Sequence, residues 1–249
     1  MLKRKWINIF LGVALLLLIV IVSYISWFKI NSNALWNIVN TQCIPLLPTT
    51  LLCLKVEQEK HYVLFKDKKG PLHNLIIPTE KITGIESSQL LEQNSPDYFA
   101  IAWQERGSLS QQTTHPIPEH LLAIAVNSQY GRSQDQLHIH IACLKPEINE
   151  TLNQLSSTIT THWASLSSKL AGHHYLAKKF PEGSPHVENS FHQLNEYVIK
   201  HHDKMGNFGL AMVQLKDGSK ILLANRLNFW DLNLGSAGEL LDYQCLANQ

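Results

Sequence analysis

In the stretch Leu137-His138-Ile139-His140-Ile141-Ala142-Cys143, apolar side chains alternate with two histidines and an alanine. Successive side chains of a β-strand point to opposite faces, so this period of two predicts a strand with both histidines on one face. Imidazoles are costly to bury unless their nitrogens have hydrogen-bond partners. We therefore expect one face of this strand to pack in the core and the other to line a functional site.

Other apolar runs predict further strands of an antiparallel sheet. These runs are residues 62–65, 72–77, 121–126, 210–215 and 220–224. The turn-forming sequence Asp67-Lys68-Lys69-Gly70 separates the first two runs and predicts a hairpin. Asp217-Gly218 separates the last two and is a strong hairpin signal.

Helical patterns occupy residues 98–106, 147–166 and 187–202. Before the first of them, Ser95-Pro96-Asp97 supplies a capping side chain, a proline and an acidic residue, all typical of a helix start. The segment between the second and third helices contains several His and Lys residues and is expected to be a connection. An antiparallel sheet with segregated helices makes the predicted fold class α+β.

Composition excludes several broad classes of protein. The chain has 249 residues, of which 16% are charged, with 12 Gly and 10 Pro, so neither a disordered nor a fibrous chain is expected. The formal net charge of +1 lacks the strongly positive field of a general nucleic-acid binder, and no nucleic-acid partner is expected. A homo-oligomer is compatible with the sequence.

Residues 6–28 carry no charge over 23 positions, which at ~1.5 Å per residue can cross a hydrocarbon layer of ~30 Å. Lys3, Arg4 and Lys5 precede this run, so the basic residues place the N-terminus in the cytoplasm. Bulky residues at the end of the run disfavour a cleaved signal peptide, and the lack of a polar face disfavours a buried globular helix. We expect one transmembrane helix before the α+β domain.

Four cysteines follow in a segment that is then expected outside the cytoplasm, where disulfides form. No Cys-x-x-Cys pair indicates zinc or redox chemistry. We expect Cys43 to pair with Cys53 across a proline-containing turn, and Cys143 to pair with Cys245. Four buried free thiols are the alternative.

The two histidines of the central strand allow three interpretations. His138 and His140 could ligate zinc, but a catalytic zinc site needs a third ligand that the sequence does not identify. They could instead be structural histidines whose ring nitrogens are satisfied. In the third interpretation one imidazole is a nucleophile and the other helps to hold the site.

The third interpretation gains support because the sequence resembles the histidine-triad superfamily of nucleotidyl hydrolases and transferases. The matching stretches, in order, are His73-Asn74-Leu75-Ile76-Ile77-Pro78, Ala125-Val126-Asn127, residues 131–134 and His138-Ile139-His140. The resemblance implies a histidine-triad-like antiparallel sheet with helices. Ala142 stands where the third histidine of the superfamily would be, which puts in doubt any proton transfer that this imidazole performs elsewhere.

Over nearly all its length the chain is more narrowly similar to the bacterial CDP-diacylglycerol pyrophosphatases, a membrane-anchored branch in which the third histidine is likewise replaced. The shared stretches include residues 103–106, Gly172-His173, residues 175–179, residues 209–213 and Gln244-Cys245. The resemblance implies hydrolysis of CDP-diacylglycerol to CMP and phosphatidate, with the membrane as a partner and no cofactor.

The resemblance also implies roles for individual residues. His140 would attack the phosphorus attached to cytidine, and His138 would orient it. Asn127, Gln134, Gly131 and Ser133 would hold phosphate oxygens, His73 would stand behind the site or beside the phosphate, and Lys178 would meet anionic lipid or pyrophosphate. A membrane-tethered nucleotide- or lipid-binding module without catalysis is the alternative, as is a zinc-dependent hydrolase that uses both histidines of the strand.

These expectations divide the chain into five segments. They are a cytoplasmic tip (1–5), a transmembrane anchor (6–28), a linker or helix (29–55), a histidine-triad-like catalytic core (56–150), and C-terminal helices with a hairpin that complete the domain (151–249). We expect the protein in the bacterial inner membrane as a single-pass protein, with its catalytic domain in the periplasm.

Overall fold

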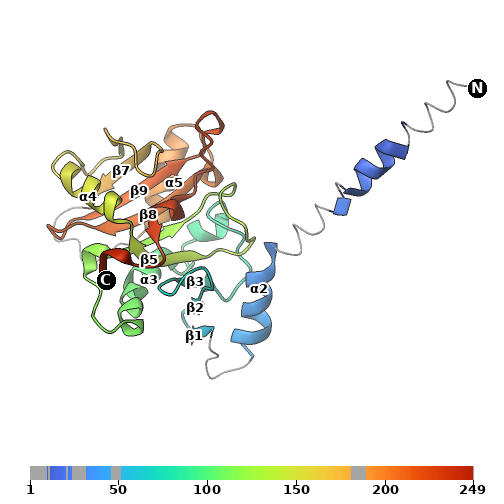
Figure 1. Cartoon of the computed structure of the whole chain (residues 1–249), viewed down its shortest axis with the longest axis horizontal. Helices are drawn as coiled ribbons and strands as arrows, with labels where there is room; N and C mark the ends of the chain where they lie inside the picture. The colour runs from blue at the N-terminus through green and yellow to red at the C-terminus, as the bar shows by residue number, and fades with distance from the viewer. Residues whose placement is uncertain are drawn as a thin grey trace, which may run out of the picture.

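The computed structural model describes residues 10, 12–20, 22–23, 32–45, 52–180 and 189–248. Within them, ten strands form one sheet in which every pair is antiparallel (Figure 1). The order across the sheet is β1-β2-β3-β5-β4-β8-β9-β7-β6, and β10 pairs with β5 beyond this path. The histidine-bearing strand β5 therefore lies near the middle of the sheet, where both of its edges are covered.

The strands have the following bounds: β1 Cys53–Glu57, β2 Tyr62–Lys66, β3 Asn74–Pro78, β4 Leu122–Val126, β5 Ile139–Leu144, β6 Ala164–Ser165, β7 Tyr175–Lys179, β8 Phe208–Gln214, β9 Lys220–Arg226 and β10 Leu241–Asp242. The α-helices are α2 Ala34–Ile38, α3 Tyr98–Glu105, α4 Pro146–Leu155 and α5 Ser190–Lys200. Short helical turns include η1 Val39–Cys43, η5 Met205–Asn207, η6 Phe229–Asp231, η7 Ala237–Leu240 and η8 Leu246–Asn248. Both expected hairpins, β2–β3 and β8–β9, are confirmed.

Both faces of the sheet are covered by helices. On one face, α3 and α5 pack on a core that includes Ile139 and Ile141 of β5. The opposite face has two separate cores. One lies under α2 and η1 against β2 and β3, and the other lies under α4 against β4, β8 and β9. Figure 1 shows α2 and α4 towards opposite ends of the sheet.

Two expectations about the segment after β5 were wrong. The helix expected over residues 147–166 ends at Leu155, and the chain then runs through serine and threonine residues whose hydroxyls bond to nearby carbonyls, as Thr158 does to Leu155 (2.8 Å). The expected connection after it contains β7, which pairs with β9 over five residue pairs from Tyr175 to Lys179. Pairing with a neighbouring strand overrides the weak β propensity of its two lysines.

The expected transmembrane helix was also wrong. Among the residues that the structure describes, no helix is both long enough and apolar enough to cross a membrane. The expected span, residues 6–28, lies partly outside the described residues, which include only 10, 12–20 and 22–23 of it. What the structure shows of the fold is the large antiparallel sheet with its helices.

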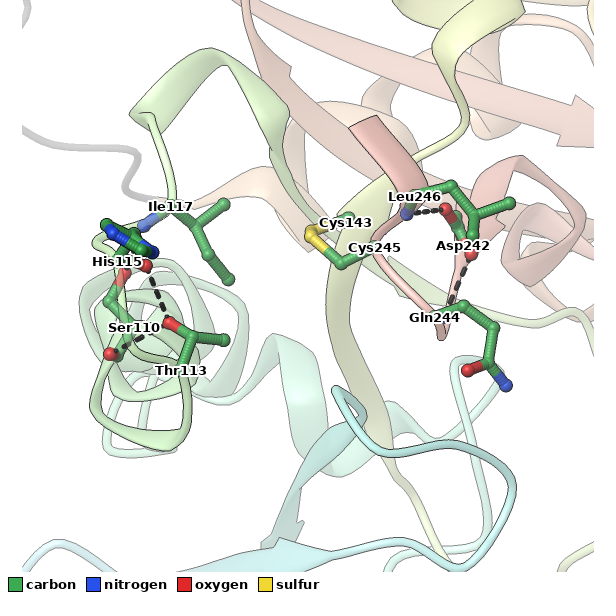
Figure 2. The surroundings of a disulfide bond; sticks show 9 residues. All are labelled: Ser110, Thr113, His115, Ile117, Cys143, Asp242, Gln244, Cys245 and Leu246. Atoms are coloured by element: carbon green, nitrogen blue, oxygen red, sulfur yellow. Dashed lines mark hydrogen bonds between the residues drawn. A yellow bond between two sulfur atoms is a disulfide. The ribbon is translucent and has the colours of Figure 1, made fainter. Parts of the chain in front are cut away.

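Both expected disulfides are confirmed. Cys43 pairs with Cys53 and joins η1 to β1, ten residues apart in sequence. Cys143 pairs with Cys245 across 102 residues and ties the end of the chain to β5 (Figure 2). Beside it, the Asp242 carboxylate accepts hydrogen bonds from the backbone N–H groups of Gln244 (2.9 Å) and Leu246 (2.7 Å). The C-terminal segment is thus fixed next to the central strand.

Candidate active site

His140 lies where the two cores of one sheet face meet. In the sheet it is paired with Leu75 of β3 on one side and with Ala125 of β4 on the other. Leu75 belongs to the core under α2, whereas Ala125 belongs to the core under α4. Directly opposed residues share a face, so His140 occupies the seam between two helical covers. Side chains of β5 alternate between the two faces of the sheet, as expected. The face that carries His140 does not remain a site along the whole strand, because the next residue on it, Ala142, packs in the core under α4.

Three histidines gather at this seam, and we call His73, His138 and His140 the histidine cluster. All three are buried, with exposed fractions of 0%, 7% and 3%. Nε2 of His73, which immediately precedes β3, lies 2.8 Å from Nδ1 of His140. The ring of His138 packs edge-on against that of His140, with centroids 5.0 Å apart. The cluster is therefore formed where β3 and β5 begin, two strands that are adjacent in the sheet but distant in sequence.

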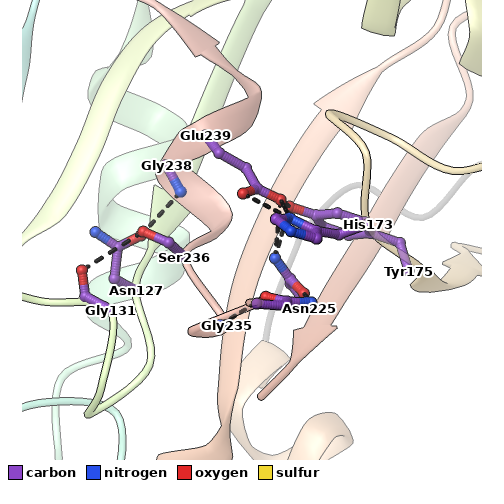
Figure 3. A network of polar contacts seen from close by, with 10 residues as sticks. Asn127, Gly131, His173, Tyr175, Asn225, Gly235, Ser236, Gly238 and Glu239 are labelled. Atoms are coloured by element: carbon purple, nitrogen blue, oxygen red, sulfur yellow. Dashed lines mark hydrogen bonds and ion pairs between the residues drawn. The ribbon is translucent and has the colours of Figure 1, made fainter. Parts of the chain in front are cut away.

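The amide of Asn127, which lies beside His140, is held in one orientation by its contacts with Ser236 and Gly238. Figure 3 shows these two contacts. Its Oδ1 accepts hydrogen bonds from the backbone N–H of Gly238 (2.9 Å) and from the hydroxyl of Ser236 (3.2 Å). A backbone N–H can only donate, so the atom that accepts from it is the oxygen. Nδ2 is consequently the atom that faces Nε2 of His140, at 3.4 Å.

This orientation fixes the protons of two imidazoles. Because an amide N–H of Asn127 points at Nε2 of His140, this nitrogen must present its lone pair. A neutral His140 then carries its proton on Nδ1 and donates it to Nε2 of His73. His73 in turn carries its proton on Nδ1, which lies 3.7 Å from Oδ1 of Asp67. The arrangement leaves His140 with an available lone pair on Nε2, as a nucleophile requires.

The tautomer of His138 is fixed separately. Its Nδ1 lies 2.7 Å from the carbonyl oxygen of Gln136, which can only accept, so Nδ1 carries the proton. Its Nε2 makes no hydrogen bond among the described residues, and the side chain lines the same pocket as His140. His138 therefore presents a second lone pair to whatever occupies this pocket.

Burial keeps the cluster uncharged at neutral pH. It lowers the pKa of His73 to about 4, against an opposing effect of Asp67. Burial also lowers the pKa of His138, and it lowers the pKa of His140 well below its usual value, with further lowering by His138 and His73. Neutral imidazole is the nucleophilic form, so the protein environment favours the reactive state.

A pocket of about 310 Å³ opens in front of the cluster. Apolar lining comes from α2 and Phe65, and polar lining comes from residues 67–69 and 133–134. Lys68 and Lys69 place two cations on the polar side. Apolar side chains together with cationic and amide groups suit a flat ring joined to phosphates.

Tyr243 covers the back of His73 and was not expected from the sequence. The two rings stack with centroids 3.9 Å apart and an angle of 13°. Burial raises the pKa of Tyr243 to about 12, so the phenol stays neutral. Tyr243 follows β10 and stands two residues before Cys245, so the disulfide to β5 holds it against the cluster. Its position beside a predicted disulfide was the only signal in the sequence.

A second polar cluster lies close to the loop that holds Asn127. The Glu239 carboxylate accepts from Nδ1 of His173 (2.9 Å), the hydroxyl of Tyr175 (2.7 Å) and Nδ2 of Asn225 (3.0 Å) (Figure 3). We call these four residues the glutamate cluster. Glu239 follows Gly238 directly, so the cluster anchors the segment whose N–H orients Asn127. Gly172-His173, one of the stretches by which the sequence resembles the family, thus contributes a structural contact through His173.

Of the other residues predicted for the site, some line the pocket and some lie away from it. Ser133 and Gln134 line the pocket, and Oε1 of Gln134 accepts from the backbone N–H of Leu35 (3.0 Å). The N–H of Gly131 donates to Ser128 instead of facing the pocket. Lys178 lies on β7, four strands from β5 in the sheet, which at ~4.8 Å per strand is roughly 19 Å away. The structure does not bring Lys178 to the histidine cluster.

The donor set for a metal does not form in the part of the chain that the structure describes. No three or more His, Cys, Asp or Glu residues are grouped there so that they could hold a metal ion. The imidazole nitrogens of His73 and His140 that approach each other are joined by a proton instead. Within the described ranges, the zinc interpretation therefore has no group of ligands to support it.

Comparisons with known proteins show the family to which this chain belongs. The family model described as CDP-diacylglycerol pyrophosphatase matches residues 30–249. This chain belongs to the CDP-diacylglycerol pyrophosphatase family. A family member from Yersinia pestis, named CDP-diacylglycerol pyrophosphatase, is 40% identical over 218 residues, which are 86% of this chain and 84% of the relative.

Among solved structures, a DUF4931 family protein from Bacillus cereus matches 70% of this chain and 84% of its own, with 14% identity and a TM-score of 0.45. This likeness is too low to say anything about the site. Membership of the CDP-diacylglycerol pyrophosphatase family rests on sequence, and the matched residues include the histidine cluster, Asn127, Tyr243 and Glu239.

Proposed function

We propose that the chain hydrolyses CDP-diacylglycerol to CMP and phosphatidate through a cytidylyl group bound covalently to His140. Its family and its 40% identical relative support the overall reaction. The observation that supports the covalent route is the orientation of Asn127, which requires a lone pair on Nε2 of His140. A nucleophile divides one difficult displacement into two easier ones.

In the first step, Nε2 of His140 attacks the phosphorus attached to cytidine. A P–N bond forms while the bond from this phosphorus to the bridging oxygen breaks, and phosphatidate leaves with that oxygen. The imidazole ring of His140 becomes positively charged, and its Nδ1 proton remains hydrogen-bonded to His73, which is backed by Asp67. This contact stabilises the charge as it develops.

In the second step, water attacks the same phosphorus and the P–N bond breaks. CMP leaves, the proton of water passes to solvent or to phosphate, and His140 returns to its neutral form. Nδ2 of Asn127 lies where it can donate to a phosphate oxygen bound in front of His140. Lys68 and Lys69 supply positive charge for the pyrophosphate on the polar side of the pocket.

The test is to trap the adduct. The enzyme is mixed with CDP-diacylglycerol labelled on the phosphorus next to cytidine, quenched, digested and mapped. We expect the label on His140 and its loss in the His140→Gln variant. Turnover without any label on protein would contradict the covalent route. Saturable binding without CMP release would instead indicate a binding module.

We also propose that the protein meets its substrate at a membrane, in an oxidising compartment such as the bacterial periplasm. A substrate with two acyl chains stays in the bilayer, so the enzyme must reach the lipid surface. Both disulfides support the oxidising compartment, because such bonds persist there. Thiol alkylation in intact cells checks this: all four cysteines should resist alkylation until a reductant is added.

A further inference from the structure

A loop that leads to Asn127 exposes apolar side chains that no described part of the chain covers. Phe229, Trp230, Leu232 and Leu234 are 64%, 98%, 87% and 45% exposed. The ring of Tyr130, on the loop that follows β4, lies edge-on to Phe229 with centroids 6.3 Å apart and is itself 48% exposed. Tyr130 thus adjoins the loop, and we call these five exposed apolar or aromatic side chains the apolar rim. Contiguous exposed apolar side chains commonly mark an interaction site.

The chain holds this loop in a defined shape. The backbones of Asn228 and Asn233 bond to each other in both directions, at 2.8 and 2.9 Å. The side chain of Asn228 accepts from the N–H of Trp230 (3.1 Å), and Leu232 adopts a left-handed conformation with φ of 53°. A left-handed conformation is unfavourable for leucine, so the surrounding bonds must maintain it. These bonds hold the loop in a shape that leaves its apolar side chains exposed.

The apolar rim is directly connected to the catalytic residues. The carbonyl oxygens of Leu234 and Gly235 accept from the side chain and the N–H of Ser128, which follows Asn127 in sequence. The next residues, Ser236 and Gly238, hold Oδ1 of Asn127. Anything bound to the rim is therefore fixed relative to the nitrogen of His140 that Asn127 faces.

We propose that the apolar rim inserts into the surface of the lipid layer that contains the substrate, so that the headgroup meets His140. The inference rests on the proposed function, in which the leaving phosphatidate carries two acyl chains. The pocket in front of His140 suits the nucleotide, whereas the rim is an exposed apolar surface that includes a tryptophan, as is typical of residues at a membrane interface.

Charge has a small part in this contact. At the base of the loop, exposed Lys204 and Arg226 are offset by Asp203, which pairs with Arg226, and by Asp231 within the loop. The rim is thus close to neutral, and apolar contact is the main source of binding. Contact with neutral as well as anionic vesicles, with little dependence on salt, is the expected behaviour.

The test compares one substrate held in a bilayer with one free in solution. The Trp230→Ser/Leu232→Ser double variant of the full chain is assayed on long-chain CDP-diacylglycerol in phosphatidylcholine vesicles and on a soluble short-chain analogue. We expect kcat/KM to fall by about tenfold or more on vesicles and to stay within about twofold on the analogue. Leu246→Ser, which alters another exposed leucine, is the matched control and should leave both rates unchanged.

A second readout does not depend on turnover. Brominated phosphatidylcholine in the vesicles should quench tryptophan fluorescence of the unaltered protein more than that of the double variant. Equal effects on both substrates, or equal quenching in the two proteins, would overturn the proposal. A change in oligomeric state with an unchanged ratio of the two rates would assign the rim to a second copy and overturn it too. No turnover of either substrate by the unaltered protein would instead contradict the proposed function.

Discussion

The histidine cluster and the glutamate cluster lie on one sheet, and they differ in how completely their hydrogen bonds are made. In the glutamate cluster, one carboxylate accepts from three separate donors within 3.0 Å. In the histidine cluster, Nδ1 of His73 has no hydrogen-bond partner among the described residues, and Asn127 approaches His140 only to 3.4 Å. Complete bonding stabilises a fold, whereas incomplete bonding leaves atoms available to a ligand.

This difference predicts that substitutions in the two clusters have different consequences. Changes in the histidine cluster should affect turnover far more than stability, because the bonds that it makes are few. Changes in the glutamate cluster should affect stability more, because the buried donors around Glu239 would lose their shared acceptor.

The largest effect is expected for His140→Gln. Glutamine has a similar length but no nucleophilic nitrogen, so kcat for CMP release should fall by about a thousandfold or more. The midpoint of thermal unfolding should change little. His115→Gln, at an exposed histidine, is the matched control and should keep full activity. A variant with substantial remaining turnover would show that His140 is not the nucleophile.

Glu239→Ala should lower stability more than His140→Gln does. It removes the carboxylate that accepts from Tyr175 and Asn225, both of which are buried, and should lower the free energy of unfolding by about 3 kcal/mol. Urea denaturation measures this change. Glu196→Ala alters an exposed glutamate of α5 and should change stability by less than about 0.5 kcal/mol. Similar losses in both variants would contradict the role given to the glutamate cluster.

The contrast between the clusters also shows what the sequence could predict. The alternation of residues 137–143 was sufficient to direct both histidines to one side, where they line one pocket, because the side-chain direction in an extended chain follows from local geometry. Both cysteine pairs could likewise be predicted. Other contacts could not, because Asn127 and Gly238 are 111 residues apart and nothing local to either one indicates the bond between them.

Local sequence patterns gave wrong or missing predictions at three places. The helix after Lys145 was expected to continue to residue 166, but it ends at Leu155. The segment from Tyr175 to Lys179 was expected to be a connection, but pairing with β9 makes it a strand. Tyr243 has no pattern of its own and reaches His73 because the disulfide of the neighbouring segment places it there. The strand and the tyrosine depend on partners that are distant in sequence, whereas the helix ends where hydroxyls such as that of Thr158 bond nearby carbonyls.

The histidine cluster should also make the protein sensitive to acid. His73 has an ordinary pKa near 6.5 when unfolded and about 4 when folded, so between these values the unfolded chain binds more protons. The stability that the neutral ring of His73 contributes is fully present well above pH 6.5, and about 2 kcal/mol of it should be lost by pH 5. Urea denaturation at several pH values measures it. The His73→Asn variant should show a shallower fall, and equal slopes would contradict the assignment.

The smallest effect on turnover is expected for Asp67→Asn, which tests whether the carboxylate beside His73 stabilises positive charge in the histidine cluster. Oδ1 of Asp67 lies 3.7 Å from Nδ1 of His73, and the carboxylate raises the pKa of that ring. In the proposed mechanism, positive charge develops on His140 during attack and is shared with His73, so a carboxylate behind His73 would stabilise the charge. Asparagine keeps the shape and removes the charge.

We therefore expect Asp67→Asn to lower kcat by about threefold to tenfold, with less effect on KM. A structural role alone would leave the pH profile unchanged. An electrostatic role would move the acidic limb of kcat/KM to lower pH, because the ring loses the charge that raises its pKa. Lys68→Gln, on the same turn, changes the charge in the opposite direction and should not produce this downward shift. An unchanged acidic limb in Asp67→Asn would show that the carboxylate acts only on the turn, where it accepts from the N–H of Lys69 at 2.8 Å.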